Sequence, residues 1–173
     1  MKRLTFLLLI VFLLGCSSQI KNCKETCKRS NSEEFCERIC EKEIFDPRWK
    51  FLDFDRLGSA WFYDPKSIVV SGNIVKVWGK QIFSERGKQN YIKRRIQREL
   101  NVKGYENLDR ALHLLKIDCS EKEYKILERI DYSDSSVLYY ADIPEFLAEW
   151  HSILPNSLIE RLFEEVCKTK NKK

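Results

Sequence analysis

The sequence predicts an α+β fold in which a small helical hairpin precedes a larger domain of strands with a C-terminal helix. Four cysteines near the N-terminus recur with helical spacing, short aromatic and β-branched runs fill the middle of the chain, and an amphipathic pattern closes it. Charged residues make up 33% of the chain and hydrophobic residues 43%. This balance is typical of a globular protein and excludes a disordered chain.

The chain opens with the pattern of an export signal. Lys2 and Arg3 precede an apolar run from Leu4 to Leu14, which ends at Gly15 and Cys16. The run is far shorter than the roughly 18 apolar residues that a membrane-spanning helix needs. We therefore expect residues 1–15 to be a signal peptide.

The stretch Leu13-Leu14-Gly15-Cys16 resembles the lipobox of bacterial lipoproteins. This resemblance implies cleavage before Cys16 and a diacylglycerol on its sulfur, so that acyl chains such as palmitate anchor the protein to a membrane. Each buried methylene contributes about 0.8 kcal/mol to such anchoring. An Asp directly after the lipidated cysteine would resemble the signal that retains lipoproteins in the inner membrane. This chain has Ser17 there, which favours the outer membrane, and the protein could lie on the periplasmic or the exterior side of that membrane.

Six cysteines remain after Cys16, an even number that is typical of a disulfide framework in an exported protein. Cys23 and Cys27 are four residues apart, as are Cys36 and Cys40, and this spacing places each pair on one face of a helix. Turn-forming residues 29–32 lie between the pairs, where Ser30 or Asn31 would cap the second helix. Two antiparallel helices would then pair Cys23 with Cys40 and Cys27 with Cys36.

The alternative for these four cysteines is a zinc site. Zinc ligands usually follow a Cys-x2-Cys spacing on turns, and an oxidising compartment favours disulfides. The spacing resembles the twin Cys-x3-Cys hairpins of several unrelated families. We expect residues 16–45 to form the lipidated cysteine and a structural hairpin, and residues 46–173, which begin with Asp46-Pro47, to form a separate domain.

Strand-type runs fill most of this domain. They are rich in aromatic and β-branched residues and are separated by Gly, Pro, Asn, Asp and Ser. Gly72-Asn73 predicts a tight hairpin between two of them. The expected strands are Trp49–Phe54, Ala60–Tyr63, Ser67–Val70, Ile74–Trp78, Leu108–Cys119, Tyr124–Ile130 and Val137–Ala141.

Residues 84–103 interrupt the strands with a basic amphipathic helix. Ile92, Ile96 and Leu100 recur at four-residue steps and predict its buried stripe. The segment has seven Lys or Arg and two Glu, which give it a net charge of +5. The formal net charge of the whole chain is also +5, so the excess positive charge is concentrated in this segment. The other sides of the helix present a candidate binding face for an anionic partner, formed by Lys93, Arg94, Arg95 and Arg98. The alternative is a solvated face without a partner.

A second helix is expected at the C-terminus. Ser157 and Glu160 have the spacing of a capping box, and Ile159, Leu162, Phe163, Val166 and Cys167 form an apolar stripe. Cys167 would therefore lie on the buried side. Cys119 is the other cysteine outside the hairpin, and its pairing with Cys167 would attach the helix to the sheet.

The sequence contains few candidate catalytic residues. The chain has two histidines, of which His113 alternates with apolar neighbours and is predicted to pack within a strand, while His151 precedes the last helix. No nucleophile elbow or phosphate-binding loop occurs in the sequence. We expect no catalytic residue, cofactor or metal ligand, and we expect the tryptophans to build the core rather than a binding platform: Trp49, Trp61, Trp78 and Trp150.

The order of several short stretches resembles the surface-adhesin protein E family. The resemblance implies a mostly antiparallel sheet of about six strands with a disulfide-tethered C-terminal helix, a homodimer, and adhesion to host extracellular-matrix proteins. The Cys-x3-Cys hairpin is an addition to that pattern. The matching stretches are Trp49, Phe62–Asp64, Ser67-Ile68, Val75–Trp78, Ile117–Cys119, Tyr124–Leu127, Trp150, Ile153–Ser157 and Val166-Cys167.

Two functions follow from the sequence. The first is an outer-membrane lipoprotein that acts as an adhesin-like binding module for a protein, an anionic polysaccharide or an anionic lipid. The alternative is a structural or assembly lipoprotein that stabilises a complex of the cell envelope. Nucleic acid is disfavoured as a partner by the compartment.

Overall fold

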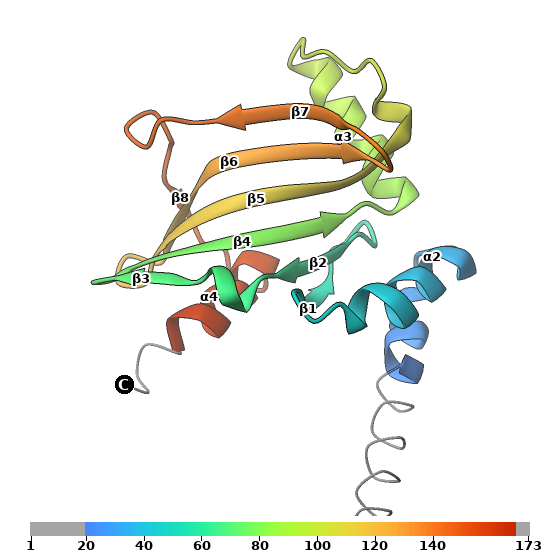
Figure 1. The fold of residues 1–173 in the computed structure, drawn as a ribbon, viewed down its shortest axis with the longest axis horizontal. Coiled ribbons are helices and arrows are strands. Elements are labelled where there is room, and N and C mark those ends of the chain that lie inside the picture. Colours follow the sequence, from blue (N-terminus) through green and yellow to red (C-terminus); the bar gives the residue numbers. More distant parts are fainter. Residues whose placement is uncertain (1–19, 169–173) are drawn as a thin grey trace, which may run out of the picture. The chain divides into compact units, whose positions relative to one another are not determined.

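The computed structural model describes residues 20–168, which form two compact units that divide between Phe45 and Asp46 (Figure 1). The expected signal peptide and the lipidated Cys16 lie outside the described residues. None of the helices within 20–168 has the length and apolar character required to cross a membrane.

The first unit is a helical hairpin. One helix includes residues 20–27, and after a turn the second arm comprises α2 (Glu33–Glu37), the π-helical η1 (Arg38–Lys42) and the 3-10 turn η2 (Glu43–Phe45). The side chain of Ser32 caps α2 by accepting a hydrogen bond from the amide of Phe35 at 3.3 Å. The predicted caps Ser30 and Asn31 were therefore wrong by one or two positions, because the turn is longer than expected.

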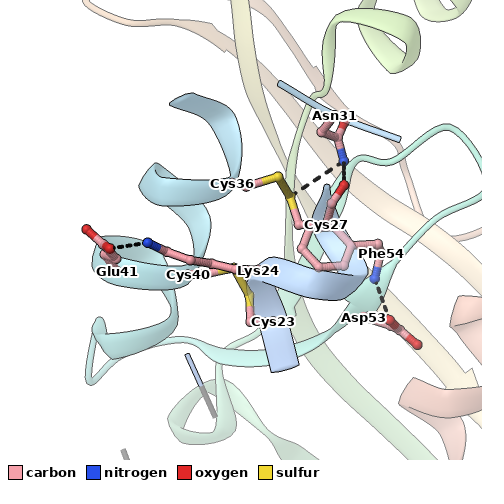
Figure 2. The surroundings of a disulfide bond; sticks show 9 residues. All are labelled: Cys23, Lys24, Cys27, Asn31, Cys36, Cys40, Glu41, Asp53 and Phe54. Carbon is pink, nitrogen blue, oxygen red and sulfur yellow. Dashed lines mark hydrogen bonds and ion pairs between the residues drawn. A yellow bond between two sulfur atoms is a disulfide. The ribbon is translucent and has the colours of Figure 1, made fainter. Parts of the chain in front are cut away.

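Two nested disulfides join the arms of this hairpin (Figure 2). Cys23 is bonded to Cys40 and Cys27 to Cys36, with Cα–Cα distances of 5.8 and 5.6 Å. Asn31 donates a side-chain hydrogen bond to the carbonyl oxygen of Cys27 at 3.3 Å. The predicted pairing is confirmed, and four of the cysteines are accounted for as disulfides rather than zinc ligands.

The second unit is an antiparallel sheet with two helices. The main path of the sheet runs β1-β2-β4-β5-β6-β7, with β3 paired to β4 and β8 paired to β6. Its elements are β1 (Lys50–Phe54), β2 (Ala60–Tyr63), η3 (Pro65–Ser67), β3 (Val69–Ser71), β4 (Ile74–Ile82), α3 (Glu85–Gln97), η4 (Tyr105–Asn107), β5 (Leu108–Asp118), β6 (Glu123–Ser133), β7 (Val137–Asp142), β8 (His151–Ser152) and α4 (Leu158–Lys168).

The expected strands are present with small shifts of their ends. The predicted hairpin at Gly72-Asn73 joins β3 to β4, with Ser71 opposite Ile74, and Gly72 has a φ of 58°, which glycine adopts without steric cost. β6 continues to Ser133, three residues beyond its predicted end at Ile130. β8 was missed because two residues carry no periodic pattern.

Both helices lie on one face of the sheet. Side chains alternate between the two faces along a strand, so Ala111, Leu115 and Ile117 of β5 share a face. Ala111 belongs to the core cluster beneath α3, whereas Leu115 and Ile117 pack in the cluster beneath α4. The helices therefore cover different ends of the same face, as the separate positions of α3 and α4 along the strands suggest (Figure 1).

The C-terminal helix follows the sequence prediction. Ser157 accepts a hydrogen bond from the amide of Glu160 at 3.1 Å, and the Glu160 carboxylate accepts one from the amide of Asn156 at 2.6 Å. Leu162 and Val166 are buried against the sheet. The Cys119–Cys167 disulfide, with a Cα–Cα distance of 5.8 Å, attaches the helix to the end of β5, so the third predicted pairing is also confirmed.

The buried stripe predicted for the basic helix was right for Ile92 and wrong for Ile96 and Leu100. α3 ends at Gln97, and Ile96 and Leu100 are 58% and 44% exposed. The side that faces the sheet is formed by Ile92 together with Gly87, Tyr91 and Arg95. A Cβ at Gly87 would lie 2.1 Å from the hydroxyl oxygen of buried Ser59, so this glycine permits the close approach of the helix to the loop before β2.

Candidate functional site

A cleft of about 800 Å³ lies between α3 and α4 on the face of the sheet that both helices share. Strand register explains which side chains form its floor. Trp61 of β2 lies opposite Gln81 of β4, which lies opposite Ala111 of β5, followed by Asp131 of β6 and Tyr139 of β7. Residues directly opposite each other in such a row point to the same face. One row thus brings together side chains from five strands.

The neighbouring row places His113 at the centre of the floor. His113 is 3% exposed and lies between Gly79 of β4, which adds no side chain, and Arg129 of β6. Its ring stacks on Trp61, with ring centroids 5.5 Å apart and an interplanar angle of 16°. Neither ring nitrogen has a hydrogen-bond partner among residues 20–168. Burial, assisted by the charge of Arg129, lowers the pKa of His113 well below its usual value, so the ring is neutral.

The Trp61 side of the floor is held by Asp55. One carboxylate oxygen accepts hydrogen bonds from the Trp61 indole at 3.2 Å and the Gln81 amide at 3.4 Å. The other oxygen accepts the backbone amides of Leu57 and Ser59, both at 2.9 Å. The negative charge of Asp55 is therefore satisfied within the domain while it orients two side chains that line the cleft.

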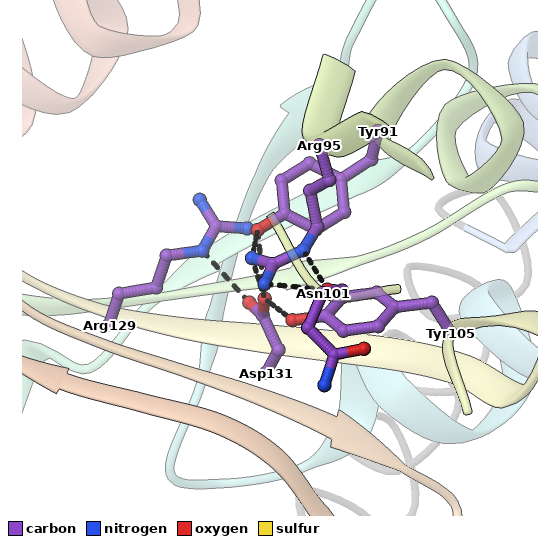
Figure 3. Close-up of polar contacts among 6 residues, drawn as sticks. All are labelled: Tyr91, Arg95, Asn101, Tyr105, Arg129 and Asp131. Carbon is purple, nitrogen blue, oxygen red and sulfur yellow. Dashed lines mark hydrogen bonds and ion pairs between the residues drawn. The ribbon is translucent and has the colours of Figure 1, made fainter. Parts of the chain in front are cut away.

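The opposite side of the cleft rests on a buried cluster around Asp131, which is fully buried (Figure 3). Its carboxylate accepts hydrogen bonds from the hydroxyls of Tyr91 and Tyr105 and from Nε of Arg129, each at 2.8 Å. Arg95 lies 3.8 Å away as a second cation. Burial is the main cause that raises the pKa of both phenols, so they remain protonated donors to Asp131.

Arg95 belongs to this cluster rather than to an exposed face. It is 5% exposed, its Nε and Nη2 atoms donate to the carbonyl oxygen of Asn101 at 3.1 and 3.0 Å, and its guanidinium lies 4.3 Å from the ring of Tyr105. The prediction that Arg95 lies on an exposed binding face was therefore wrong. Its long side chain reaches over the end of α3 and satisfies a backbone carbonyl, which an amphipathic pattern does not reveal.

The other predicted basic residues are exposed, but they do not act as one group. Arg94 and Arg98 line the cleft, whereas Lys93 does not. Arg94 and Arg98 are one helical turn apart, and neither has a carboxylate partner in the described part of the chain. Like charges at this spacing destabilise a helix by about 0.2–0.5 kcal/mol. An anion bound between them would remove that repulsion.

The cleft is therefore basic and partly apolar. Five arginines line it, and two of them, Arg95 and Arg129, share the carboxylate of Asp131 as their ion-pair partner. The apolar part of the lining comes from Trp61, Phe83, Leu100, Leu115, Tyr124, Ile126, Tyr139 and Ile159. Such a surface favours an anionic group that is attached to an apolar body.

Arg56 and Arg129 were not predicted as site residues. Arg56 follows β1 in a loop and gives no sequence signal, whereas Arg129 and Asp131 alternate with apolar residues on β6 and point to the same face. Opposite charges two residues apart on a strand are the signal that would have identified Arg129 and Asp131. Within residues 20–168, no three His, Cys, Asp or Glu side chains are grouped so as to hold a metal ion.

The remaining aromatic predictions have different outcomes. Trp49 is buried, as expected of a core residue, and Trp78 is half-buried. Trp150 is 38% exposed and packs against the ammonium of Lys125, 4.7 Å from its ring. His151 is exposed on β8 and contacts the ring of Tyr124. Neither Trp150 nor His151 lines the cleft.

Two comparisons with known proteins, one with family models and one with solved structures, both find similarity to protein E. The family model described as surface-adhesin protein E matches residues 49–168. One solved structure of Haemophilus influenzae protein E matches 71% of this chain and 87% of its own chain, with 12% identity and a TM-score of 0.44. Another crystal form of that protein matches 64% and 82%, with 12% identity and a TM-score of 0.43. The search among curated proteins found no match.

Proposed function

We propose, from the premise that this chain belongs to the surface-adhesin protein E family, that it is an outer-membrane lipoprotein whose larger unit binds a macromolecular partner. The family is one of adhesins and not of enzymes. Membership supports a binding function at the cell surface or in the envelope. The signal pattern ending at Cys16 supports the lipid anchor.

The observation that carries the binding function is the basic edge of the cleft. Arg94 and Arg98 extend from α3 without carboxylate partners among residues 20–168, and Lys93 lies beside them in the sequence. Exposed cations that are not neutralised within the protein attract an acidic surface and accelerate its association. An acidic face of a partner protein therefore suits this edge best.

Salt and charge dependence test this function. The variant with Lys93, Arg94 and Arg98 changed to Ala should retain its fold, because exposed charges contribute little to stability. In a pull-down from detergent-solubilised envelope it should recover at least about tenfold less partner than the wild type, and the wild-type yield should fall with salt because salt screens exposed charges. Arg95 is left unchanged, since it is buried.

The matched control removes three exposed lysines elsewhere in the domain: Lys66, Lys103 and Lys122. Both variants lose the same charge, so a reduction confined to the first variant assigns binding to the edge of the cleft. Equal recovery by the wild type and both variants at low salt would refute the assignment.

A second candidate function is supported by the hairpin of residues 20–45, which lies outside the stretch matched by the family. A disulfide-stapled module between the expected anchor and the binding domain is suited to holding an envelope complex together. The test is to recover the envelope complex with the full chain and to map the contacts by cross-linking. Stoichiometric recovery with cross-links on residues 20–45 would favour this structural role. Cross-links confined to residues 46–168 would favour the adhesin-like role.

The lipid anchor gives a further prediction. Cys16→Ala should yield an unprocessed or soluble exported protein, because the acceptor of the diacylglycerol is removed. Membrane fractionation and mass spectrometry of the N-terminal peptide check this. Cys119→Ala, which removes a cysteine of a disulfide but leaves Cys16 and the signal intact, should remain in the membrane fraction. A Cys16→Ala protein that still fractionates with the outer membrane, together with a wild type that carries no lipid, would refute the anchor.

A further inference from the structure

The floor of the cleft carries polar groups that its own domain does not satisfy. Nδ1 and Nε2 of His113 and Nη2 of Arg129 are buried and have no hydrogen-bond partner among residues 20–168. A buried donor or acceptor without a partner costs about 1–3 kcal/mol. Asp55 and Asp131, the nearby acids, already accept four and three hydrogen bonds respectively. Acceptor oxygens from a ligand would satisfy Nη2 of Arg129 and the single N–H of the neutral His113 ring.

The polar groups lie beneath a basic entrance. Arg94 in the last turn of α3 and Arg98 at its C-cap line the same cleft, and Arg56 lines it from the loop after β1. A guanidinium can bind a carboxylate through two parallel hydrogen bonds, which are stronger than those of neutral donors. The charge at the entrance thus selects an anionic group, and a carboxylate matches the guanidinium donors there.

Apolar side chains line the cleft from its entrance to its interior. Leu100 is 44% and Tyr139 36% exposed, and Trp61, Tyr124 and Ile126 are half-buried along the interior. Clefts of about 300–1,000 Å³ with apolar walls and a few polar groups are typical of small-molecule sites. The cleft, at about 800 Å³, lies in this range.

We propose that the cleft binds a carboxylate that is attached to an apolar body, with Arg94 and Arg98 holding the carboxylate and Trp61, Tyr124 and Ile126 contacting the body. This inference rests on the proposed function, because it names the chemical group that the binding module recognises. His113 remains neutral and offers one donor and one acceptor at the floor. It is a polar contact for the ligand, not a countercharge.

Calorimetric titration of the full mature chain tests the charge requirement. The probes are 2-naphthoate and laurate below its micelle concentration, which represent an aromatic and an aliphatic body. Naphthalene-2-carboxamide and 2-naphthylmethylammonium have similar shapes but no negative charge. At least one carboxylate should bind at least about tenfold more tightly than the amide or the ammonium. Equal binding of the three naphthalene compounds, or no saturable binding of either carboxylate, would overturn the proposal.

Two variants locate the site. Arg94→Gln combined with Arg98→Gln should weaken binding of the carboxylate at least about tenfold, whereas Lys66→Gln combined with Lys103→Gln should not change it. Trp61→Phe should retain calorimetric binding but lose the ligand-induced change in tryptophan fluorescence. Persistence of that fluorescence change in Trp61→Phe, or unchanged affinity in the double arginine variant, would place the ligand elsewhere. Circular dichroism checks that each variant is folded.

The two proposals fail separately. If the wild type captures an envelope partner through its basic edge but binds neither carboxylate, the carboxylate site is wrong and the proposed function stands. If the carboxylates bind with the expected charge dependence but the pull-down recovers no partner, the macromolecular function is wrong and the ligand site stands.

Discussion

Asp131→Asn is expected to lower the free energy of unfolding by about 3–5 kcal/mol, the typical cost of removing one partner from a buried ion pair. Asp131 is fully buried and accepts three hydrogen bonds, from Tyr91, Tyr105 and Arg129, while Arg95 lies 3.8 Å away. Asparagine has the same shape but no charge, so two guanidinium groups would lose their common counterion. The corresponding loss of melting temperature is about 10–20 °C for a domain of this size.

Thermal and urea denaturation followed by circular dichroism measure this effect. Asp134→Asn is the matched control, because Asp134 is exposed in the turn after β6 and its replacement should change stability by less than about 0.5 kcal/mol. If Asp131→Asn is destabilised no more than this control, the cluster does not depend on the charge of Asp131. The expected loss would instead show that the anchoring of α3 to β6 and η4 depends on that carboxylate.

The same cluster explains why the predicted buried stripe of α3 was wrong at Ile96 and Leu100. Hydrophobicity alone selects Ile92, Ile96 and Leu100 as the buried stripe. The buried stripe actually includes Arg95, because Asp131, 36 residues later in the chain, and the carbonyl of Asn101 together satisfy its guanidinium. A long-range ion pair cannot be recognised from the local pattern of one segment, although it decides which side of the helix faces the sheet.

The disulfides and strands were predictable for the opposite reason, since local geometry determines them. A four-residue spacing places Cys23 and Cys27 on one side of a helix, and a short turn leaves a single nested pairing with the second arm. Alternation along β5 likewise placed His113 inside the sheet. These inferences need only the period of one element and the length of one connection.

The cleft required the register of the whole sheet. Trp61, Gln81 and His113 come from three strands, and they are neighbours only because β2, β4 and β5 pair in one particular register. A shift of one residue would turn the entire set to the opposite face. Of the four basic residues predicted as a binding face, Arg94 and Arg98 line the cleft, and the binding role itself stays a prediction.

Removal of the Cys119–Cys167 disulfide is the second large effect we expect. The two residues are 48 positions apart, and for a loop of this length the chain-entropy model gives a stabilisation of about 4 kcal/mol. Cys119→Ala combined with Cys167→Ala should therefore lower the free energy of unfolding by about that amount in urea denaturation. The cause is the larger conformational freedom of the unfolded chain, so the buried contacts of α4 with Val75 and Val77 should remain in the folded state.

The hairpin offers a matched comparison within the same molecule. Cys27 and Cys36 are separated by 9 positions, and the same model gives about 2.6 kcal/mol for their bond, which closes a shorter loop. Its removal acts on the first unit, so the unfolding of residues 46–168 should be unchanged. Limited proteolysis distinguishes a lowered global stability from local release of α4, since early cleavage at Arg161 requires the helix to detach. If the double variant of Cys119 and Cys167 unfolds at the wild-type urea concentration without such cleavage, packing of Leu162 and Val166 alone holds the helix, and the disulfide contributes no measurable stability.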